Sequence, residues 1–273
     1  MTQGPILLEL KQVTRKFGGL VAVNQLDMQI YPNTIHGLIG PNGAGKSTAF
    51  DLISGLTALT SGAVYLEGRD MTRVSVEDRV LAGICRTFQT PKLFEKMTAH
   101  EVVMTGRHLH GRTGILGSMF SIQAKRKDEH AIAESAFELL KFVGLQEQFN
   151  QVVADLPYGK RRLVEIARAL ATEPKILLLD EVASGLNPVE TKAVGDLIEK
   201  LPSRGITVVL VEHDMRFVMR LCGVITVLNF GAKIVDGTPA EISTNQDVIQ
   251  AYLGQPRSAE QARRTLRKKS VKL

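Results

Sequence analysis

The sequence predicts an α/β fold: a mostly parallel sheet covered by helices, a small antiparallel β subdomain near the N-terminus and an inserted α-helical subdomain. Three observations support this prediction. Two segments before residue 34 have the pattern of strands, the pattern becomes helical between residues 91 and 155, and short apolar runs then alternate with helices. The 273 residues are enough for such a fold to bury a sizeable core.

The first strands are expected at residues 6–10 and 21–30, which alternate or run apolar on either side of two glycines at 18–19. They are interpreted as an antiparallel pair. The apolar segment 64–66, which is soon followed by a glycine, predicts one more short strand.

The middle of the chain has a helical pattern. Residues 97–103 and 128–143 predict helices, whereas residues 106–127, rich in glycine and basic residues, are interpreted as a long loop or a broken helix. The apolar face of the second helix consists of Ile132, Ala136, Leu139, Leu140 and Val143.

The C-terminal half alternates between helices and strands. A helix is clear at 158–171, where apolar residues recur at helical spacing. Such alternation predicts parallel strands that carry helices on both faces of the sheet. The strands are expected at 176–179, 206–211 and 224–228, and the helices between them at 188–201 and about 214–222.

Composition and charge narrow the class of protein. Apolar residues make up 44% of the chain and charged residues 23%, as in ordinary globular proteins. No apolar run approaches the roughly 18 residues of a membrane span, no signal peptide is visible, and the isolated Cys85 and Cys222 indicate reduced thiols in the cytoplasm.

The net charge of +6 comes from residues 255–273, which carry seven Lys or Arg and one acid. The rest of the chain is balanced, so its basic character does not indicate a nucleic-acid partner. This basic tail is interpreted as a solvated end, with attraction to anionic lipid headgroups as the alternative.

A glycine-rich segment joins an expected buried strand at 34–39 to an expected helix at 49–53. It has the form G-x-x-x-x-G-K-S, in which backbone N–H groups and a helix N-terminus bind a triphosphate. Lys46 is predicted to reach the β- and γ-phosphates and the Ser47 hydroxyl to bind Mg²⁺. The residues expected to bind ATP here are Gly40, Pro41, Asn42, Gly43, Ala44, Gly45, Lys46, Ser47 and Thr48.

Two carboxylates follow the apolar strand at 176–179. Asp180, at the end of the strand, is predicted to lie near the phosphates and to hold Mg²⁺ through water. Glu181, one residue further on, can accept a proton from a water that attacks the γ-phosphate.

Two more polar residues are candidates for the same site. His213 follows the strand at 206–211 and can hydrogen-bond the γ-phosphate or the attacking water. Gln89 lies where the strand region meets the helical insert, and its amide can bind Mg²⁺ or orient water. The predicted catalytic residues are thus Lys46, Gln89, Glu181 and His213, and the predicted Mg²⁺ ligands are Ser47, Gln89 and Asp180.

The order of these features resembles the ATP-binding cassette (ABC) ATPase family of P-loop NTPases, which have a RecA-like core. The resemblance implies that Phe17 stacks on adenine, that Ser184–Asn187 is the D-loop and that His213 is the switch histidine. It also implies one ABC ATPase domain. The expected bounds are 5–254 for that domain, with a core at 5–90 and 156–254, a helical subdomain at about 91–155 and a basic tail at 255–273.

In that family two such domains close over two ATP, and each presents a signature, usually L-S-G-G-Q, to its partner's nucleotide. Here the segment reads Leu156-Pro157-Tyr158-Gly159-Lys160, so the serine hydroxyl is missing and Pro157 has no N–H. Gly159 still permits a close approach of backbone. The partner-facing candidates are Pro157, Tyr158, Gly159 and Lys160.

These departures, together with the motifs around them, are similar to ATPase subunits of branched-chain amino acid importers. The resemblance implies a heterodimer with a second ATPase subunit, two membrane permease subunits, a periplasmic binding protein and a place on the cytoplasmic face of the membrane. ATP hydrolysis would then energise uptake, and Leu93, Phe94 and Met97 are candidates for a groove that meets the permease or, equally, for core residues. The alternatives are related urea, other amino acid or amide, or lipopolysaccharide systems, and a nucleotide-gated subunit with weak hydrolysis.

Overall fold

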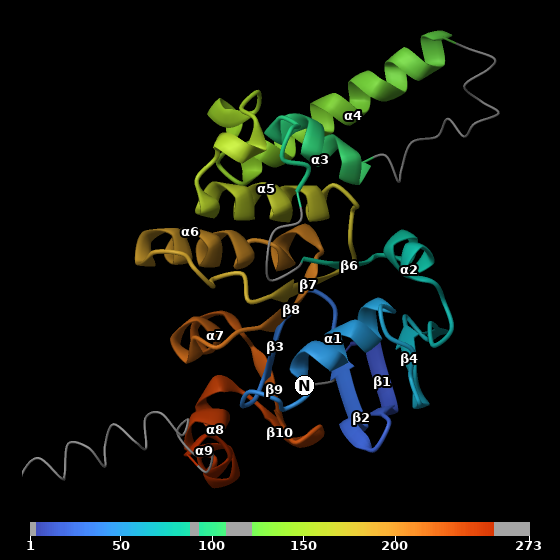
Figure 1. Cartoon of the computed structure of the whole chain (residues 1–273), viewed down its shortest axis with the longest axis vertical. Coiled ribbons are helices and arrows are strands. Elements are labelled where there is room, and N and C mark those ends of the chain that lie inside the picture. The colour runs from blue at the N-terminus through green and yellow to red at the C-terminus, as the bar shows by residue number, and fades with distance from the viewer. Residues whose placement is uncertain (1–3, 88–92, 108–121, 254–273) are drawn as a thin grey trace, which may run out of the picture.

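The computed structural model describes residues 4–87, 93–107 and 122–253, with side chains between 122 and 127 and at 253 left aside. Its secondary structure contains two sheets and a set of helices on either side of the larger one (Figure 1). The smaller sheet is antiparallel, in the order β2-β1-β4-β5. Its strands are β1 (Leu8–Phe17), β2 (Leu20–Ile30), β4 (Ser61–Leu66) and β5 (Arg69–Asp70).

The predicted antiparallel strand pair is confirmed, but both strands are longer than expected. β1 and β2 pair from Leu8 with Ile30 to Phe17 with Leu20, so the two glycines between them form the whole turn. The exposed ends of these strands conceal their length, because Lys16, Phe17 and Leu20 are all exposed and show no alternation of buried and exposed residues.

The larger sheet has the order β10-β9-β3-β8-β7-β6. Its five strands from β9 to β6 run parallel, and β10 pairs with β9 in the antiparallel sense. The predicted strands are confirmed. Every residue of β3, β7 and β8 is buried, and a strand buried on both faces has a continuous apolar sequence. The strands are β3 (Ile35–Ile39), β6 (Ile84–Arg86), β7 (Ile176–Asp180), β8 (Thr207–Val211), β9 (Val224–Asn229) and β10 (Ala232–Gly237).

Helices occupy both faces of this sheet. The nine α-helices of the described residues are α1 (Lys46–Ser54), α2 (Val76–Ala82), α3 (Ala99–Arg107), α4 (Ile122–Phe142), α5 (Tyr158–Leu170), α6 (Pro188–Ile198), α7 (Met215–Leu221), α8 (Pro239–Thr244) and α9 (Gln246–Leu253). Short 3₁₀ turns lie at Gln146–Gln148, Val153–Asp155 and Pro202–Arg204. None of the helices in these ranges is both long and apolar enough to cross a membrane.

The segment expected to be a loop or broken helix is helical at both ends. α3 continues to Arg107, and α4 begins at Ile122, before the predicted start at 128. Residues 122–127 contain mostly good helix formers, so propensity extends the helix beyond its apolar pattern. The rest of the expected loop, 108–121, lies outside the described residues.

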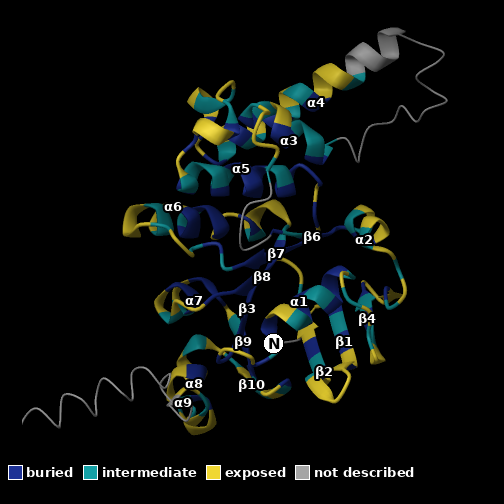
Figure 2. Ribbon diagram, viewed as in Figure 1, coloured by how far each residue is buried: buried dark blue, intermediate teal, exposed yellow. Residues whose placement is uncertain are grey.

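Alternate side chains of each central strand enter different cores. Ile176 and Leu178 of β7 join a core shared with the antiparallel sheet and α1, whereas Leu177 and Leu179 join a core shared with α3–α7. The dark blue of the central strands in Figure 2 reflects this two-sided burial. The carboxyl ends of β3, β7 and β8 are thereby fixed beside one another at one edge of the sheet.

Candidate active site

The phosphate loop connects β3 to α1, and its backbone is packed too closely for most side chains. A Cβ atom on Gly40 would lie 2.2 Å from the carbonyl oxygen of Leu228, and one on Gly45 would lie 2.5 Å from that of Ala22. Gly45 also has a φ of 101°, in the left-handed region that glycine tolerates. The glycines therefore allow the loop to lie against β2 and β9.

Lys46 lies inside the curve of this loop. Its Nζ donates hydrogen bonds to the carbonyl oxygens of Gly40 and Pro41, at 2.7 and 3.0 Å. Burial lowers the pKa of Lys46, while the nearby carboxylates of Glu181 and Asp180 act in the opposite direction. The ammonium group thus lies at the centre of the loop, where it can exchange carbonyl partners for anionic ones.

One cavity of about 690 Å³ brings most of the predicted nucleotide-binding residues together. It is lined along one side by Asn42–Thr48 of the phosphate loop and on others by Phe17, Glu181 and His213. Phe17 is 47% exposed, and one face of its ring carries the Arg15 guanidinium, whose Cζ is 4.4 Å from the ring centroid. Gln89 lies outside the described residues.

Asp180 is nearly buried at the end of β7, and an arginine neutralises it. An amino group of Arg86 donates to Asp180 Oδ2 at 2.9 Å, and the other contacts Asp51 Oδ1 at 2.5 Å. Arg86 ends β6, which pairs with β7 directly, so the sheet itself sets this contact. Sequence reasoning missed Arg86, because a strand of three residues has too little periodicity to be recognised.

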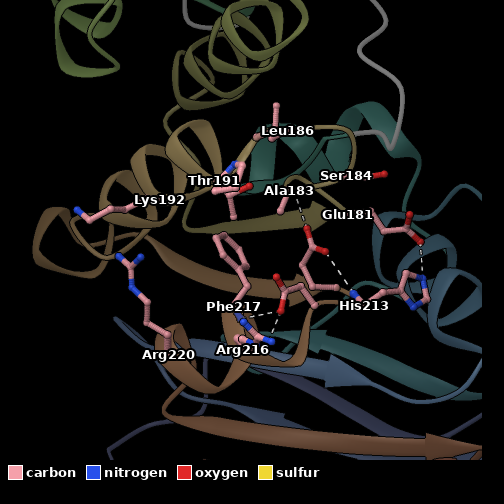
Figure 3. Close-up of a pocket in the computed structure, with 13 residues that line it drawn as sticks. Glu181, Ala183, Ser184, Leu186, Thr191, Lys192, His213, Arg216, Phe217 and Arg220 are labelled. Atoms are coloured by element: carbon pink, nitrogen blue, oxygen red, sulfur yellow. Dashed lines mark hydrogen bonds and ion pairs between the residues drawn. The ribbon is translucent and has the colours of Figure 1, made fainter.

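Glu181 and His213 face each other across the ends of β7 and β8. The His213 Nε2 lies 2.8 Å from Glu181 Oε1, and a dashed line marks this contact in Figure 3. Glu181 has a φ of 48°, which is uncommon for a residue other than glycine, and its N–H donates to the Val211 carbonyl at 2.9 Å. The backbone therefore holds the Glu181 side chain in a conformation that directs it to His213.

Behind this pair, Glu212 connects the two strand ends, and the sequence analysis assigned it no role. Its Oε1 accepts the Ala183 N–H at 2.7 Å and its Oε2 accepts the His213 N–H at 3.2 Å. Burial raises the pKa of Glu212, although both hydrogen bonds oppose this. A cavity of about 560 Å³ beside it is lined by residues of the 181–192 and 212–220 segments (Figure 3).

The segment 157–160 begins α5 and lies apart from the cavity of the phosphate loop. Pro157 stands at the N-cap without a side-chain cap, and Tyr158 is the first helical residue. The Tyr158 ring packs against Gly185, and its hydroxyl accepts a hydrogen bond of 3.2 Å from the buried Arg162. A Cβ on Gly159 would lie 2.4 Å from Glu190 Oε1, so a larger residue there would displace the Glu190 side chain, which belongs to the capping box of α6. Lys160 is half-buried.

The remaining candidates lie elsewhere. Leu93 is half-buried against the larger core, whereas Phe94 and Met97 are 55% and 36% exposed. In the predicted D-loop, Asn187 caps α6: its side chain accepts the N–H groups of Val189 and Glu190. A capping role thus accounts for asparagine at this position.

The oxygen atoms near the loop suit Mg²⁺, which prefers one or two carboxylates together with hydroxyl, water and phosphate oxygens. Ser47 lines the cavity, and Asp180 is the last residue of β7. Within the described ranges no three His, Cys, Asp or Glu side chains gather into a metal site.

Comparison with known families gives two matches. The family described as "ABC transporter" matches residues 23–184, and the family described as "Branched-chain amino acid ATP-binding cassette transporter" matches residues 232–257. The first match includes the phosphate loop, Asp180 and Glu181, and the second begins at β10.

Curated proteins of similar sequence carry corresponding names. The high-affinity branched-chain amino acid transport ATP-binding protein BraF of Pseudomonas aeruginosa is 42% identical over 250 residues, which cover 91% of this chain and 98% of BraF. The protein LivG of Escherichia coli K12, with the same description, is 39% identical over the same shares of the two chains.

Solved structures agree with this relationship. A nucleotide-free ATP-binding cassette from an ABC transporter has a TM-score of 0.79 and 27% identity, over 90% of this chain and 98% of its own. Another cassette, in its ADP conformation, has a TM-score of 0.80 and 28% identity, over 92% and 99%. The chain therefore belongs to the ABC transporter family, and within it to the branched-chain amino acid ATP-binding cassettes.

Proposed function

We propose that this chain is the ATP-binding and ATP-hydrolysing subunit of an ABC importer that takes up branched-chain amino acids across the cytoplasmic membrane. The observation that carries the proposal is the meeting of the phosphate loop, Glu181 and His213 in one cavity. The alignments with BraF and LivG each cover 91% of this chain, and the names of these two proteins support the choice of substrate.

Binding begins with the phosphate loop. Backbone N–H groups of Asn42–Thr48 and the N-terminus of α1 face a triphosphate, and Phe17 stacks on the adenine with the ring face that Arg15 leaves open. Lys46 exchanges its bonds to the Gly40 and Pro41 carbonyls for bonds to phosphate oxygens. Because the charge of these oxygens replaces neutral acceptors, this exchange favours the nucleotide.

Hydrolysis depends on the strand ends. Glu181 accepts the proton of a water placed in line with the γ-phosphate, and His213 fixes the orientation of its carboxylate through Nε2. Ser47, Asp180 and Gln89 would hold Mg²⁺, which neutralises phosphate charge when bound. Arg86 keeps the Asp180 carboxylate in place at the end of β7.

The chain works within an assembly in this proposal. A second ATPase subunit closes over the nucleotide and receives the Pro157–Lys160 segment, which lies outside this chain's own cavity. Phe94 and Met97, exposed on the helical subdomain at about 91–155, contact a permease subunit, and a substrate-binding protein delivers the amino acid. The domain at 5–254 then lies on the cytoplasmic face of the membrane as a peripheral subunit.

Reconstitution of the purified chain with its second ATPase, permease and binding protein in liposomes tests the function. ATP hydrolysis is expected to rise on addition of leucine, isoleucine or valine, and not on addition of urea. Stimulation by urea instead would contradict the proposed substrate, while the proposed ATP-hydrolysing role of the chain would stand. A complex that contains Lys46→Ala serves as the control for hydrolysis by contaminating enzymes.

A further inference from the structure

The turn between β9 and β10 brings an aromatic side chain to the cavity of the phosphate loop. Phe230 lies between the two strands and lines the same cavity as Phe17 and the loop. Its side chain is 80% exposed, more than that of Phe17 at 47%. Nothing in the proposed mechanism uses this residue.

Gly231, the residue after Phe230, is hydrogen-bonded to two of the elements that surround the cavity. The Gly231 N–H donates to the Ala44 carbonyl at 3.0 Å, and the Gly231 carbonyl accepts the Asn24 N–H at 2.8 Å. A Cβ on Gly231 would lie 2.8 Å from the Ala22 carbonyl oxygen. The position of Phe230 is thus fixed relative to the phosphate loop and β2.

Phe230 is unfavourable in two ways when the chain is considered alone. Its φ of 46° lies in the left-handed region, where asparagine and glycine are the usual residues and a bulky side chain is rare. Its ring also remains largely in water, although burial of a phenyl ring is strongly favourable. Unfavourable backbone conformations of this kind persist where the surrounding structure holds them, and they are enriched at active and ligand-binding sites.

The chemistry of the cavity indicates the ligand group. The Arg15 guanidinium covers one face of Phe17, which leaves one face of that ring for a flat partner. A base stacked on Phe17 would still present its own second face or edge to the cavity, and Phe230 is an exposed aromatic residue in the lining of that cavity. Aromatic pairs favour offset-stacked or edge-to-face contact, and both are open to a ring on a tight turn.

We propose that Phe230 is a second aromatic contact for the nucleobase of ATP, so that the base is held between residues of the β1–β2 hairpin and the β9–β10 turn. This assignment rests on the proposed function, because it requires that the cavity binds a nucleotide. It gives the cavity a preference for nucleotides over phosphate chains without a base.

The test compares the binding of Mg-ATP and Mg-tripolyphosphate to the purified full chain by calorimetry. Phe230→Asn removes the ring and suits the left-handed backbone, so this variant is expected to fold. Its affinity for ATP is expected to fall at least about fivefold, as loss of an aromatic–base contact does, while its affinity for tripolyphosphate stays unchanged. Phe230→Tyr keeps the ring and is expected to bind both ligands as the unmodified chain does.

Two variants serve as controls. Phe17→Ala is expected to show the same selective loss for ATP, and Val189→Ala removes an exposed apolar side chain, 79% exposed, that does not line the cavity. Unchanged ATP affinity in Phe230→Asn would overturn the assignment, as would an equal loss for both ligands. Failure of the unmodified chain to bind either ligand would instead overturn the proposed function itself.

Discussion

The imidazole of His213 and the carboxylate of Glu181 are in contact, with Nε2 2.8 Å from Oε1. The two residues are far apart in sequence, yet each follows the last residues of a strand, and β7 and β8 are neighbours in the sheet. A hydrogen bond from the imidazole N–H would restrict the carboxylate to one orientation. The contact therefore assigns His213 a positioning role toward the proposed base.

His213→Ala is expected to lower kcat about a hundredfold, the usual scale for loss of help in general-base catalysis, and to change the Kd for ATP less than threefold. His213→Gln, which retains an N–H donor, is expected to recover part of the rate. Steady-state ATPase assays and nucleotide titrations measure the two constants. A large rise in Kd with normal kcat would assign His213 to binding instead.

Lys46→Ala is expected to weaken ATP binding about ten- to a hundredfold, because a hydrogen bond to a charged group is lost. Lys46→Arg is not expected to restore affinity, since the broad guanidinium has to enter a space where Lys46 is only 6% exposed. Titration with a fluorescent ATP analogue checks both variants. Lys200→Ala, at an exposed position, provides a matched control that should bind normally.

Arg86→Ala is expected to lower the free energy of unfolding by about 3–5 kcal/mol, because it leaves a buried carboxylate uncompensated. The Arg86 and Asp180 side chains are each only 9% exposed. Lys192→Ala breaks a comparable pair with Asp196 on the surface of α6, and should lower stability by less than about 1 kcal/mol. Urea unfolding of both variants makes the comparison, and equal losses would contradict the structural role of Arg86.

The lowered pKa of His36, a residue outside the candidate active site, predicts that the stability of the fold depends on pH. Burial lowers its pKa from 6.5 to about 4, and its Nε2 lies 2.8 Å from the Thr226 hydroxyl. The unfolded chain therefore binds a proton between pH 6.5 and pH 4 that the folded chain does not. The contribution of His36 to the free energy of unfolding is therefore fully present above pH 6.5. It falls by about 3 kcal/mol as the pH drops toward 4.

Urea unfolding at several pH values measures this loss. His36→Gln has no titrating ring and keeps an N–H donor, so the difference between it and the unmodified chain should shrink or reverse on acidification. Parallel curves for the two proteins would show that His36 titrates normally in the fold.

Much of this fold can be predicted because its central strands are buried on both faces. β3, β7 and β8 are continuous apolar runs, and helical spacing is clear in α5. β6 and β10 could not be predicted in this way, since one has three residues and the other is only partly buried. α2 is short and its only buried residue is Arg79, which is 1% exposed and donates to backbone carbonyls such as that of Leu52.

The site is predictable where function requires a sequence motif. Lys46, Glu181 and His213 follow strands, so the sequence placed them at one edge of the sheet. Arg86, Glu212 and Phe230 depend on which strands become neighbours, and the register of β6 on β7 and the β9–β10 turn follow from long-range pairing. No local pattern indicates that Arg86 meets Asp180 or that Phe230 lines the cavity of the phosphate loop.

The central claim is that Glu181 is the base of an ATP-hydrolysing site, and Glu181→Gln tests it most directly. The amide keeps the size of the side chain and cannot accept the proton, so the reconstituted complex should bind ATP with nearly unchanged affinity. Its ATPase rate should fall at least about a hundredfold. A rate close to that of the unmodified complex, measured with ATP binding intact, would contradict the assignment.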